Sequence, residues 1–143
     1  MILALSAGRD APQELRSRLA LDEAGQRKLL RSLPEAGEVL ELAVLCTCHR
    51  TEIYAATSGP TSEALHAAAA LLPDLRATDH HDLKFMDGPE AIEHLFRVAC
   101  GLDSLVIGEP QVLGQVRHAY VLAKEEKTAG RVLSRVVDRA IRL

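Results

Sequence analysis

The chain has very few aromatic residues and no long apolar run. Two tyrosines and two phenylalanines, with no tryptophan, make up 3% of its 143 residues. It contains no 18-residue apolar segment and no signal-peptide pattern, so we expect neither a membrane span nor export. An apolar content of 48%, rich in leucine, alanine and valine, is typical of a globular cytoplasmic protein. A chain of this length can bury a core without disulfides or metal.

An excess of positive charge is also lacking. The formal net charge is −3, so the overall balance does not call for a nucleic-acid partner. A local basic surface is still compatible with this sum, because electrostatic steering depends on where the charges sit. Arg131, Arg135 and Arg139 recur every four residues near the end of the chain. Such a stripe is either a solvated helix face or a set of phosphate contacts.

Only three cysteines are present, and two of them occur in LCTCHRTEIYA, residues 45–55. In a chain that is not exported, we expect free thiols. If the segment is a strand, Cys46 and Cys48 lie roughly 7 Å apart, which is at the outer limit for a disulfide. Zinc sites usually take four ligands from two separated pairs. Cys46, Cys48 and His49 form one crowded cluster, so a small metal-binding domain is the weaker alternative.

Hydrophobic periodicity and helix boundary signals predict an α+β protein. Asp22 is expected to cap one helix, and Asp87 with Glu90 to form a capping box for another. The order of elements, βαββαβ, predicts a small antiparallel sheet with flanking helices, ferredoxin-like, followed by C-terminal helices. Strands are expected at residues 1–5, 38–46, 51–57 and 82–88, and helices within residues 11–33 (two helices), 61–72, 89–100, 110–126 and 130–143.

The corner between the second and third predicted strands has an unusual composition. Strand alternation places Cys46 toward the core, together with Leu40, Leu42, Val44 and Cys48 on one face. Cys48 then sits at the strand end, followed by His49 and Arg50, where a two-residue turn normally takes Asn-Gly or Asp-Gly. A cation such as Arg50 raises the thiolate fraction of a nearby thiol and can grip a carboxylate. Cys48 is therefore either a small half-buried apolar residue or a nucleophile.

The predicted helix at residues 89–100 contains a histidine away from its apolar stripe. Ile92, Leu95, Phe96 and Ala99 form the stripe, and His94 falls nearly opposite its centre. We expect His94 to be solvated or to face a cleft formed by another part of the domain. A histidine close to a cysteine is a recognised nucleophile arrangement.

Two blocks of sequence resemble the N-terminal catalytic domain of the glutamyl-tRNA reductases. They are TCHRTEIY and HLFRVACGLDSLVIGEPQVLGQVRHAY, and with APQELRSRLAL the resemblance covers nearly the whole chain. It implies an NADPH-dependent enzyme that converts glutamyl-tRNA(Glu) to glutamate 1-semialdehyde through a cysteine thioester, at the start of tetrapyrrole (haem) biosynthesis. The alternative is a diverged, non-catalytic paralogue that binds tRNA, haem or a partner protein.

The resemblance assigns roles to individual residues. Cys48 would be the nucleophile, His94 would assist proton transfer, and Arg50 with Thr47 would hold the glutamyl group. The other positions implied to contact substrate are His49, Ser104, Glu109, Pro110, Gln111 and Gln115. Read from the residues alone, Ser104 is a loop hydroxyl, Glu109 a charge at a helix start, and the two glutamines exposed helix residues.

This chain departs from the family pattern at two places. His49 stands where the family usually has asparagine, which accepts a positive φ more readily, although histidine is also enriched there. Residues 7–12, Ala-Gly-Arg-Asp-Ala-Pro, replace the family's Asn-His-Lys-Thr/Ser-Ala-Pro, with the loss of a histidine and a hydroxyl. The second departure puts any function of that loop in doubt.

The resemblance also implies a longer protein. No stop signal ends the last predicted helix and no glycine-rich dinucleotide fingerprint occurs in residues 1–143. We therefore expect this to be a catalytic domain that ends at the start of a long spacer helix, without the NADPH-binding and dimerisation domains. The whole protein would be a cytoplasmic homodimer that works with glutamate-1-semialdehyde aminomutase, with neither a metal nor a membrane.

Overall fold

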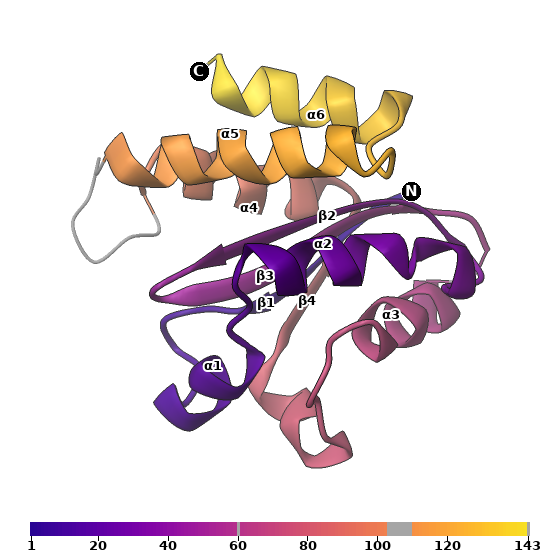
Figure 1. The fold of residues 1–143 in the computed structure, drawn as a ribbon, viewed down its shortest axis with the longest axis vertical. Helices are drawn as coiled ribbons and strands as arrows, with labels where there is room; N and C mark the ends of the chain where they lie inside the picture. The colour runs from indigo at the N-terminus through magenta and orange to yellow at the C-terminus, as the bar shows by residue number, and fades with distance from the viewer. Residues whose placement is uncertain (60, 103–109, 143) are drawn as a thin grey trace.

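The core of the protein is a four-stranded antiparallel sheet with the strand order β2-β3-β1-β4 (Figure 1). It is seen in a computed structural model that describes residues 1–59, 61–102 and 110–142. The strands are β1 (Ile2–Ala7), β2 (Val39–Thr47), β3 (Arg50–Thr57) and β4 (Lys84–Asp87). This confirms the predicted βαββαβ arrangement with a small antiparallel sheet.

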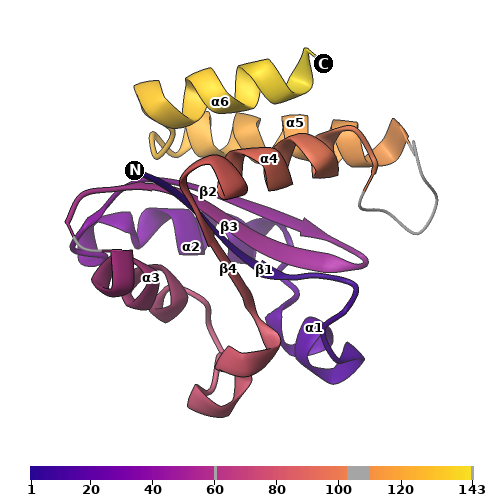
Figure 2. The same ribbon diagram turned by 180° about the vertical axis from the view of Figure 1, so that it is seen from behind.

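Helices cover both faces of the sheet (Figures 1 and 2). One face carries α1 (Gln13–Leu19), α2 (Glu23–Arg31) and α3 (Thr61–Ala70), and the other carries α4 (Gly88–Ala99), α5 (Pro110–Glu125) and α6 (Arg131–Ile141). Two short 3-10 helices, η1 (Leu33–Glu35) and η2 (Ala77–Asp82), precede β2 and β4. The predicted C-terminal helices, α5 and α6, thus pack with α4 on one face of the sheet. No helix in the described part of the chain is both long and apolar enough to cross a bilayer.

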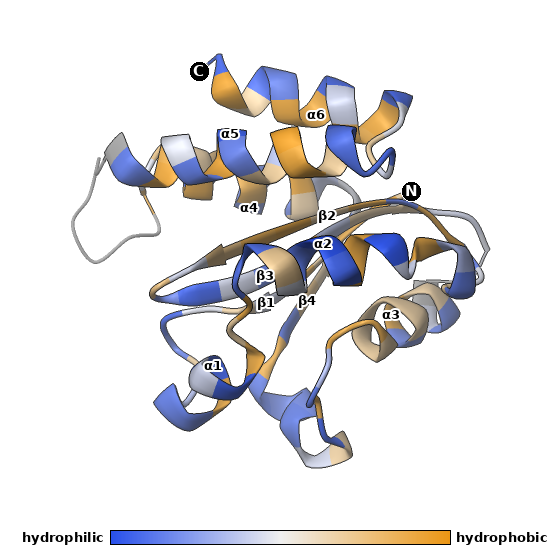
Figure 3. Cartoon of the chain, viewed as in Figure 1, coloured by the Kyte–Doolittle hydropathy of each residue, from blue (hydrophilic) through white to orange (hydrophobic). Residues whose placement is uncertain are grey.

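Covering both faces explains the composition of the strands. All six residues of β1 are buried, and the strands are largely apolar in Figure 3, whereas the helices show one hydrophilic side. Alternate residues enter two separate cores: Leu3 and Leu5 face α1 to α3, and Ile2 and Ala4 face α4 to α6. The polar side chain of Ser6 lies on the second of these faces, next to the site described below.

The predicted alternation fails at the start of β2. Leu42 and Val44 are fully buried as expected, but Leu40 is 60% exposed. A register irregularity between Val39 and Glu41 inserts one residue into the pairing with β3 and turns Leu40 outward. The expectation that Leu40 shares their face was therefore wrong.

One of the two predicted helix caps is present. The carboxylate of Asp22 accepts a hydrogen bond from the Gly25 N–H at 2.7 Å and caps α2 as predicted. Asp87 is the residue before α4, yet its side chain makes no capping hydrogen bond, so the predicted capping box with Glu90 was wrong. The second residue of α4 is Pro89, which has no N–H, and this removes one of the two donors that a cap normally binds.

A side chain from the sheet caps α6. The Glu41 carboxylate accepts hydrogen bonds from the N–H groups of Gly130, Val132 and Leu133, at 2.8, 3.2 and 2.9 Å. A negative charge here also complements the positive end of the helix dipole. A larger residue at position 130 would push the Glu41 carboxylate out of this place, because a Cβ there would lie 2.7 Å from its carboxyl carbon.

Substituting Glu41 tests this cap. We expect Glu41→Ala to lower the free energy of unfolding by about 1–2 kcal/mol, since three helix N–H groups lose their charged acceptor. Urea denaturation measures the loss. Glu38→Ala, at a half-buried carboxylate just before β2, is the control. An equal effect of both substitutions would contradict a specific role in capping α6.

Candidate functional site

Cys48 lies at an exposed two-residue turn. Thr47 pairs with Arg50 across the β2–β3 hairpin, which leaves Cys48 and His49 as the connection. Neither residue has a positive φ, and the His49 N–H donates to the Thr47 hydroxyl at 3.2 Å. The histidine that replaces the family's asparagine therefore costs no backbone strain. Thr47, predicted to contact substrate, stabilises through this hydrogen bond the turn that contains the Cys48 thiol.

The three cysteines have different surroundings. Cys46, predicted to be in the core, is half-buried on the face toward α1 and α2. Its sulfur accepts a hydrogen bond from the Leu21 N–H at 3.2 Å and lies 3.4 Å from the Thr51 hydroxyl. Cys48 and Cys100 are exposed, the latter at the end of α4. The described residues contain no group of three or more Cys, His, Asp or Glu side chains that could hold a metal.

Two residues after Arg50, a fully buried carboxylate organises a polar cluster. The Glu52 side chain is 0% exposed. Its Oε2 accepts hydrogen bonds from the Ser6 hydroxyl at 2.5 Å and from His94 Nε2 at 2.6 Å, and its Oε1 accepts one from the Tyr54 hydroxyl at 2.6 Å. Arg50 Nη1 lies 3.4 Å from Oε2, with the Arg50 side chain only 4% exposed. We call Ser6, Arg50, Glu52, Tyr54 and His94 the Glu52 cluster.

Glu52 remains ionised within this cluster. Burial acts to raise the pKa of Glu52, but the hydrogen bond from His94, the charges of His94 and Arg50, and the Ser6 hydroxyl together hold that pKa below its ordinary value. An ionised carboxylate only accepts hydrogen bonds, so Nε2 of His94 must carry a proton. The contact thus fixes the state of one ring nitrogen and leaves Nδ1 for proton transfer.

His94 lies on the buried face of α4, contrary to the prediction from its apolar stripe. The residue is 8% exposed, and its ring stacks on Tyr54 with 6.5 Å between centroids. The buried face runs through Ala91, His94, Leu95, Val98 and Ala99, while Ile92 and Phe96 are half-buried. The predicted stripe was wrong because the buried Glu52 carboxylate on the sheet binds the His94 imidazole. A pattern of apolar residues gives no sign of such a polar partner.

His94 also lines a hollow of about 360 Å³, in agreement with the expectation that it faces a cleft. The lining includes Ser6 and His94, and its rim comes from the β1–α1 loop and the segment before β4. The other described residues around it are Gly8, Arg9, Asp10, Ala11, His81, Asp82, Leu83 and Lys84. All buried polar side-chain atoms of the described residues have a partner, and Nδ1 of His94 makes no hydrogen bond to them, so Nδ1 reaches accessible space.

The predicted residues come together only in part. Arg50 and His94 meet at Glu52, and Cys48 is two residues from Arg50, but Cys48 is not among the described residues that line the hollow. On α5, Gln111 is exposed and Gln115 half-buried. The start of α5 lies toward the same end of the molecule as the β2–β3 turn (Figures 1 and 2). Pro110 opens α5, and Ser104 and Glu109 lie outside the described residues.

Sequence reasoning missed Glu52, Ser6 and Tyr54. A signal for Glu52 was present, because a lone acidic residue inside an apolar strand, two residues from an arginine and two from a tyrosine, shares one face with both. A buried carboxylate in that position needs partners. Ser6, in an otherwise apolar β1, lies directly opposite Glu52 in the pairing of β1 with β3. Strand pairing cannot be read from a single strand, so Ser6 had no comparable signal.

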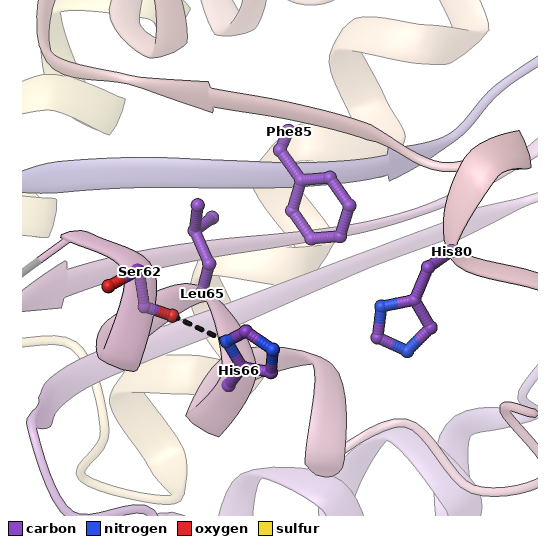
Figure 4. A pocket seen from close by; sticks show the side chains of 5 residues that line it. All are labelled: Ser62, Leu65, His66, His80 and Phe85. Atoms are coloured by element: carbon purple, nitrogen blue, oxygen red, sulfur yellow. Dashed lines mark hydrogen bonds between the residues drawn. The ribbon is translucent and has the colours of Figure 1, made fainter. Parts of the chain in front are cut away.

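A second hollow is apolar and lies on the other side of the sheet (Figure 4). It has a volume of about 210 Å³ and is lined by Ser62, Leu65, His66, His80 and Phe85. His66 Nδ1 contacts the Ser62 carbonyl at 2.7 Å, and the His80 ring tilts against Phe85. Neither a thiol nor a carboxylate lines it, so the Glu52 cluster and the Cys48 turn remain the candidate site.

Comparison with known proteins gives one consistent family. The family model described as "Glutamyl-tRNAGlu reductase, N-terminal domain" matches residues 7–143. Glutamyl-tRNA reductase of Shouchella clausii is 40% identical over 141 residues, covering 93% of this chain and 30% of the relative. That of Rubrobacter xylanophilus is 41% identical over 140 residues, covering 94% and 32%.

The fold agrees with a solved member. Glutamyl-tRNA reductase from Methanopyrus kandleri superposes with a TM-score of 0.78 at 29% identity, covering 99% of this chain and 32% of that one. The chain spans about a third of the length of the curated relatives it matches. With a family model matching all but the first six residues, this chain belongs to the family of glutamyl-tRNA reductase N-terminal domains.

Proposed function

We propose that this chain is the catalytic, substrate-binding part of a glutamyl-tRNA reductase, which accepts the glutamyl group of glutamyl-tRNA(Glu) on Cys48. The observation that carries the proposal is an exposed thiol on a turn that continues directly into a strand bearing Arg50 and Glu52, with Glu52 bound to His94. Acyl transfer needs a nucleophile, a group to bind the acyl chain and a group to move protons. The three are supplied by Cys48, Arg50 and His94.

The proposed reaction is one acyl transfer. The Cys48 thiolate attacks the carbonyl carbon of the ester, a carbon–sulfur bond forms, and the bond from that carbon to the terminal ribose oxygen breaks. The ribose oxygen leaves as a hydroxyl after it takes up a proton, and we assign His94 to this proton transfer. Arg50 offers a guanidinium to the glutamyl carboxylate, beside Thr47 and His49. Gln111, Gln115 and, from outside the described residues, Ser104 and Glu109 complete the proposed substrate contacts, next to Pro110.

The proposal for this chain ends at the thioester. In the whole enzyme, NADPH would supply the hydride that releases glutamate 1-semialdehyde for tetrapyrrole biosynthesis. Residues 1–143 do not fit this cofactor, because they lack the glycine-rich turn that binds a dinucleotide. We therefore assign NADPH to another domain of a longer protein. That protein would be a homodimer in the cytoplasm, where charged tRNA occurs, and would pass its product to the aminomutase.

Transfer of labelled glutamate tests the proposal. After incubation with glutamyl-tRNA(Glu) labelled in the glutamate, we expect label on the protein, within the peptide that contains Cys48 and removable by hydroxylamine. NADPH should not be consumed by this chain. Uncharged tRNA with free labelled glutamate is the control. An absence of protein-bound label would favour a non-catalytic binding domain, and steady NADPH oxidation would contradict the assignment of the cofactor to another domain.

A further inference from the structure

The outer face of α6 carries a row of arginines that make no ion pair with the described residues. Arg135, Arg139 and Arg142 are exposed and, with Asp138, surround a shallow hollow of about 510 Å³. Arg131 lies one turn earlier on the same side. Among the described residues, none of the four has a carboxylate within ion-pair distance. We call Arg135, Arg139 and Arg142 the α6 arginine surface.

Several other arginines of the described residues have acidic partners. Arg18 binds Asp79 through two nitrogens, each at 2.8 Å. Arg27 and Arg31 of α2 bind Glu125 and Glu126 at the end of α5, at 2.7 to 2.9 Å. A solvated helix face normally pairs its charges in this way. The α6 arginine surface, with three neighbouring arginines on one helix, differs from these paired arginines.

The arrangement is unfavourable for the isolated helix. Like charges four residues apart, as in Arg131, Arg135 and Arg139, each cost roughly 0.2–0.5 kcal/mol. The helix dipole offsets this only for the residues of the last turn, Arg139 and Arg142. Packing does not require the guanidinium groups either, because α6 is held by Leu133, Val137 and Ala140 on its opposite, buried side. The stability of α6 therefore does not explain why these arginines lie along one side of it.

Charge and position both favour a large anion. Residues 131–142 contain four arginines and one aspartate, a net charge of +3, so the rest of the chain carries −6 of the total of −3. The carboxyl end of α6 points to the side of the molecule on which the β2–β3 turn that holds Cys48 lies, although α6 itself is at the top of both views (Figures 1 and 2). A polyanion with its terminus at that turn would extend past the α6 arginine surface.

We propose that the α6 arginine surface binds the phosphate backbone of the tRNA whose glutamyl end reaches Cys48. The proposal rests on the proposed function, and it assigns to α6 a positioning role for the RNA. The spacing of the arginines, one helix turn or about 5.4 Å apart, lets neighbouring guanidinium groups bind phosphates along one strand. Backbone contacts of this kind hold an RNA in register without reading its sequence.

The test is the salt dependence of binding to uncharged tRNA(Glu), measured by fluorescence anisotropy over a range of KCl concentrations. Each lost phosphate contact lowers the slope of log affinity against log salt by about 1. We expect Arg135→Gln and Arg139→Gln each to lower the slope by about 1, and the double variant by about 2 with at least roughly tenfold weaker binding at low salt. The double lysine variant should keep most of the slope, because the charge is retained.

Lys28→Gln is the matched control. Lys28 is an exposed cation on α2, in the layer on the other face of the sheet, so its loss should leave the slope unchanged. An unchanged slope in the double glutamine variant, or an equal drop for Lys28→Gln, would overturn the proposal. Uncharged tRNA requires no chemistry at Cys48. If the wild-type protein accepts the glutamyl group but the double glutamine variant keeps the wild-type salt slope, only this inference is contradicted. If binding depends on the arginines but no glutamyl group is transferred, only the proposed acyl transfer is contradicted.

Discussion

Cys48→Ser is expected to lower the rate of glutamyl transfer from glutamyl-tRNA to the protein by at least about a thousandfold. A serine hydroxyl is almost wholly protonated at neutral pH, and no base among the described residues contacts position 48, so serine is a far weaker nucleophile than a thiol there. Cys48 is exposed at a turn, and its sulfur makes no hydrogen bond to the described residues. The free energy of unfolding should therefore stay within about 0.5 kcal/mol of the wild-type value.

Two other cysteines provide matched controls for this prediction. Cys100→Ser changes another exposed thiol, at the end of α4, and should leave transfer intact. Cys46→Ser places a hydroxyl where the sulfur meets the Leu21 N–H and the Thr51 hydroxyl, so it should cost stability more than activity. Rapid-quench measurement of protein-bound label gives the rates. Full transfer in Cys48→Ser, or its loss in Cys100→Ser, would move the nucleophile away from Cys48.

The fold was predictable because its strongest signals are local. Asp22 predicts the start of α2 because it caps the N–H of Gly25, only three residues later. Apolar runs likewise indicate each strand. Non-local events were not predictable: the irregularity that exposes Leu40 depends on pairing with β3, and the layer formed by α4 to α6 depends on both faces of the sheet being apolar. Glu41 caps a helix about ninety residues later in the chain, a contact with no local pattern.

The candidate site likewise contains residues that the sequence predicted and residues that depend on non-local contacts. The exposure of Cys48 follows from its place at a hairpin end, and the resemblance to the reductases pointed to Arg50 and His94. Periodicity placed His94 on the wrong side of α4, because it counts only apolar neighbours. Glu52 joins β3, β1 and α4 through polar contacts that depend on strand register and helix placement together. Those contacts became visible only in three dimensions.

Glu52→Gln is expected to lower the free energy of unfolding by about 3–5 kcal/mol, because it removes a buried carboxylate charge that faces both Arg50 and His94. Tyr54→Phe is the matched control. It deletes the hydrogen bond to Oε1 and leaves the His94 contact to Oε2 in place, so its cost should be about 1–2 kcal/mol. Urea denaturation of both variants at neutral pH gives the comparison.

The pH dependence of this difference has a definite sign. Because the pKa of Glu52 is lowered in the folded protein, its contribution to stability is complete above the pKa of an unfolded glutamate, about 4.3, and declines as the pH falls below it. Other carboxylates with lowered pKa values, such as Asp79, weaken the wild type and the variant alike in acid. The gap in unfolding free energy between wild type and Glu52→Gln should therefore narrow below about pH 4.3. A gap that widens in acid would contradict an ionised Glu52.

Catalysis separates a positioning role for Glu52 from a structural one. A glutamine at position 52 can present either its oxygen or its NH₂ group to His94, so Nε2 is no longer held as the donor. Glutamyl transfer per folded molecule should then fall on the order of a hundredfold, the scale of a misplaced acid–base group. Tyr54→Phe keeps the carboxylate on Nε2 and should retain most of the activity. If transfer in folded Glu52→Gln equals that of Tyr54→Phe, the Glu52 cluster serves only to stabilise the fold, and His94 needs no fixed proton to act.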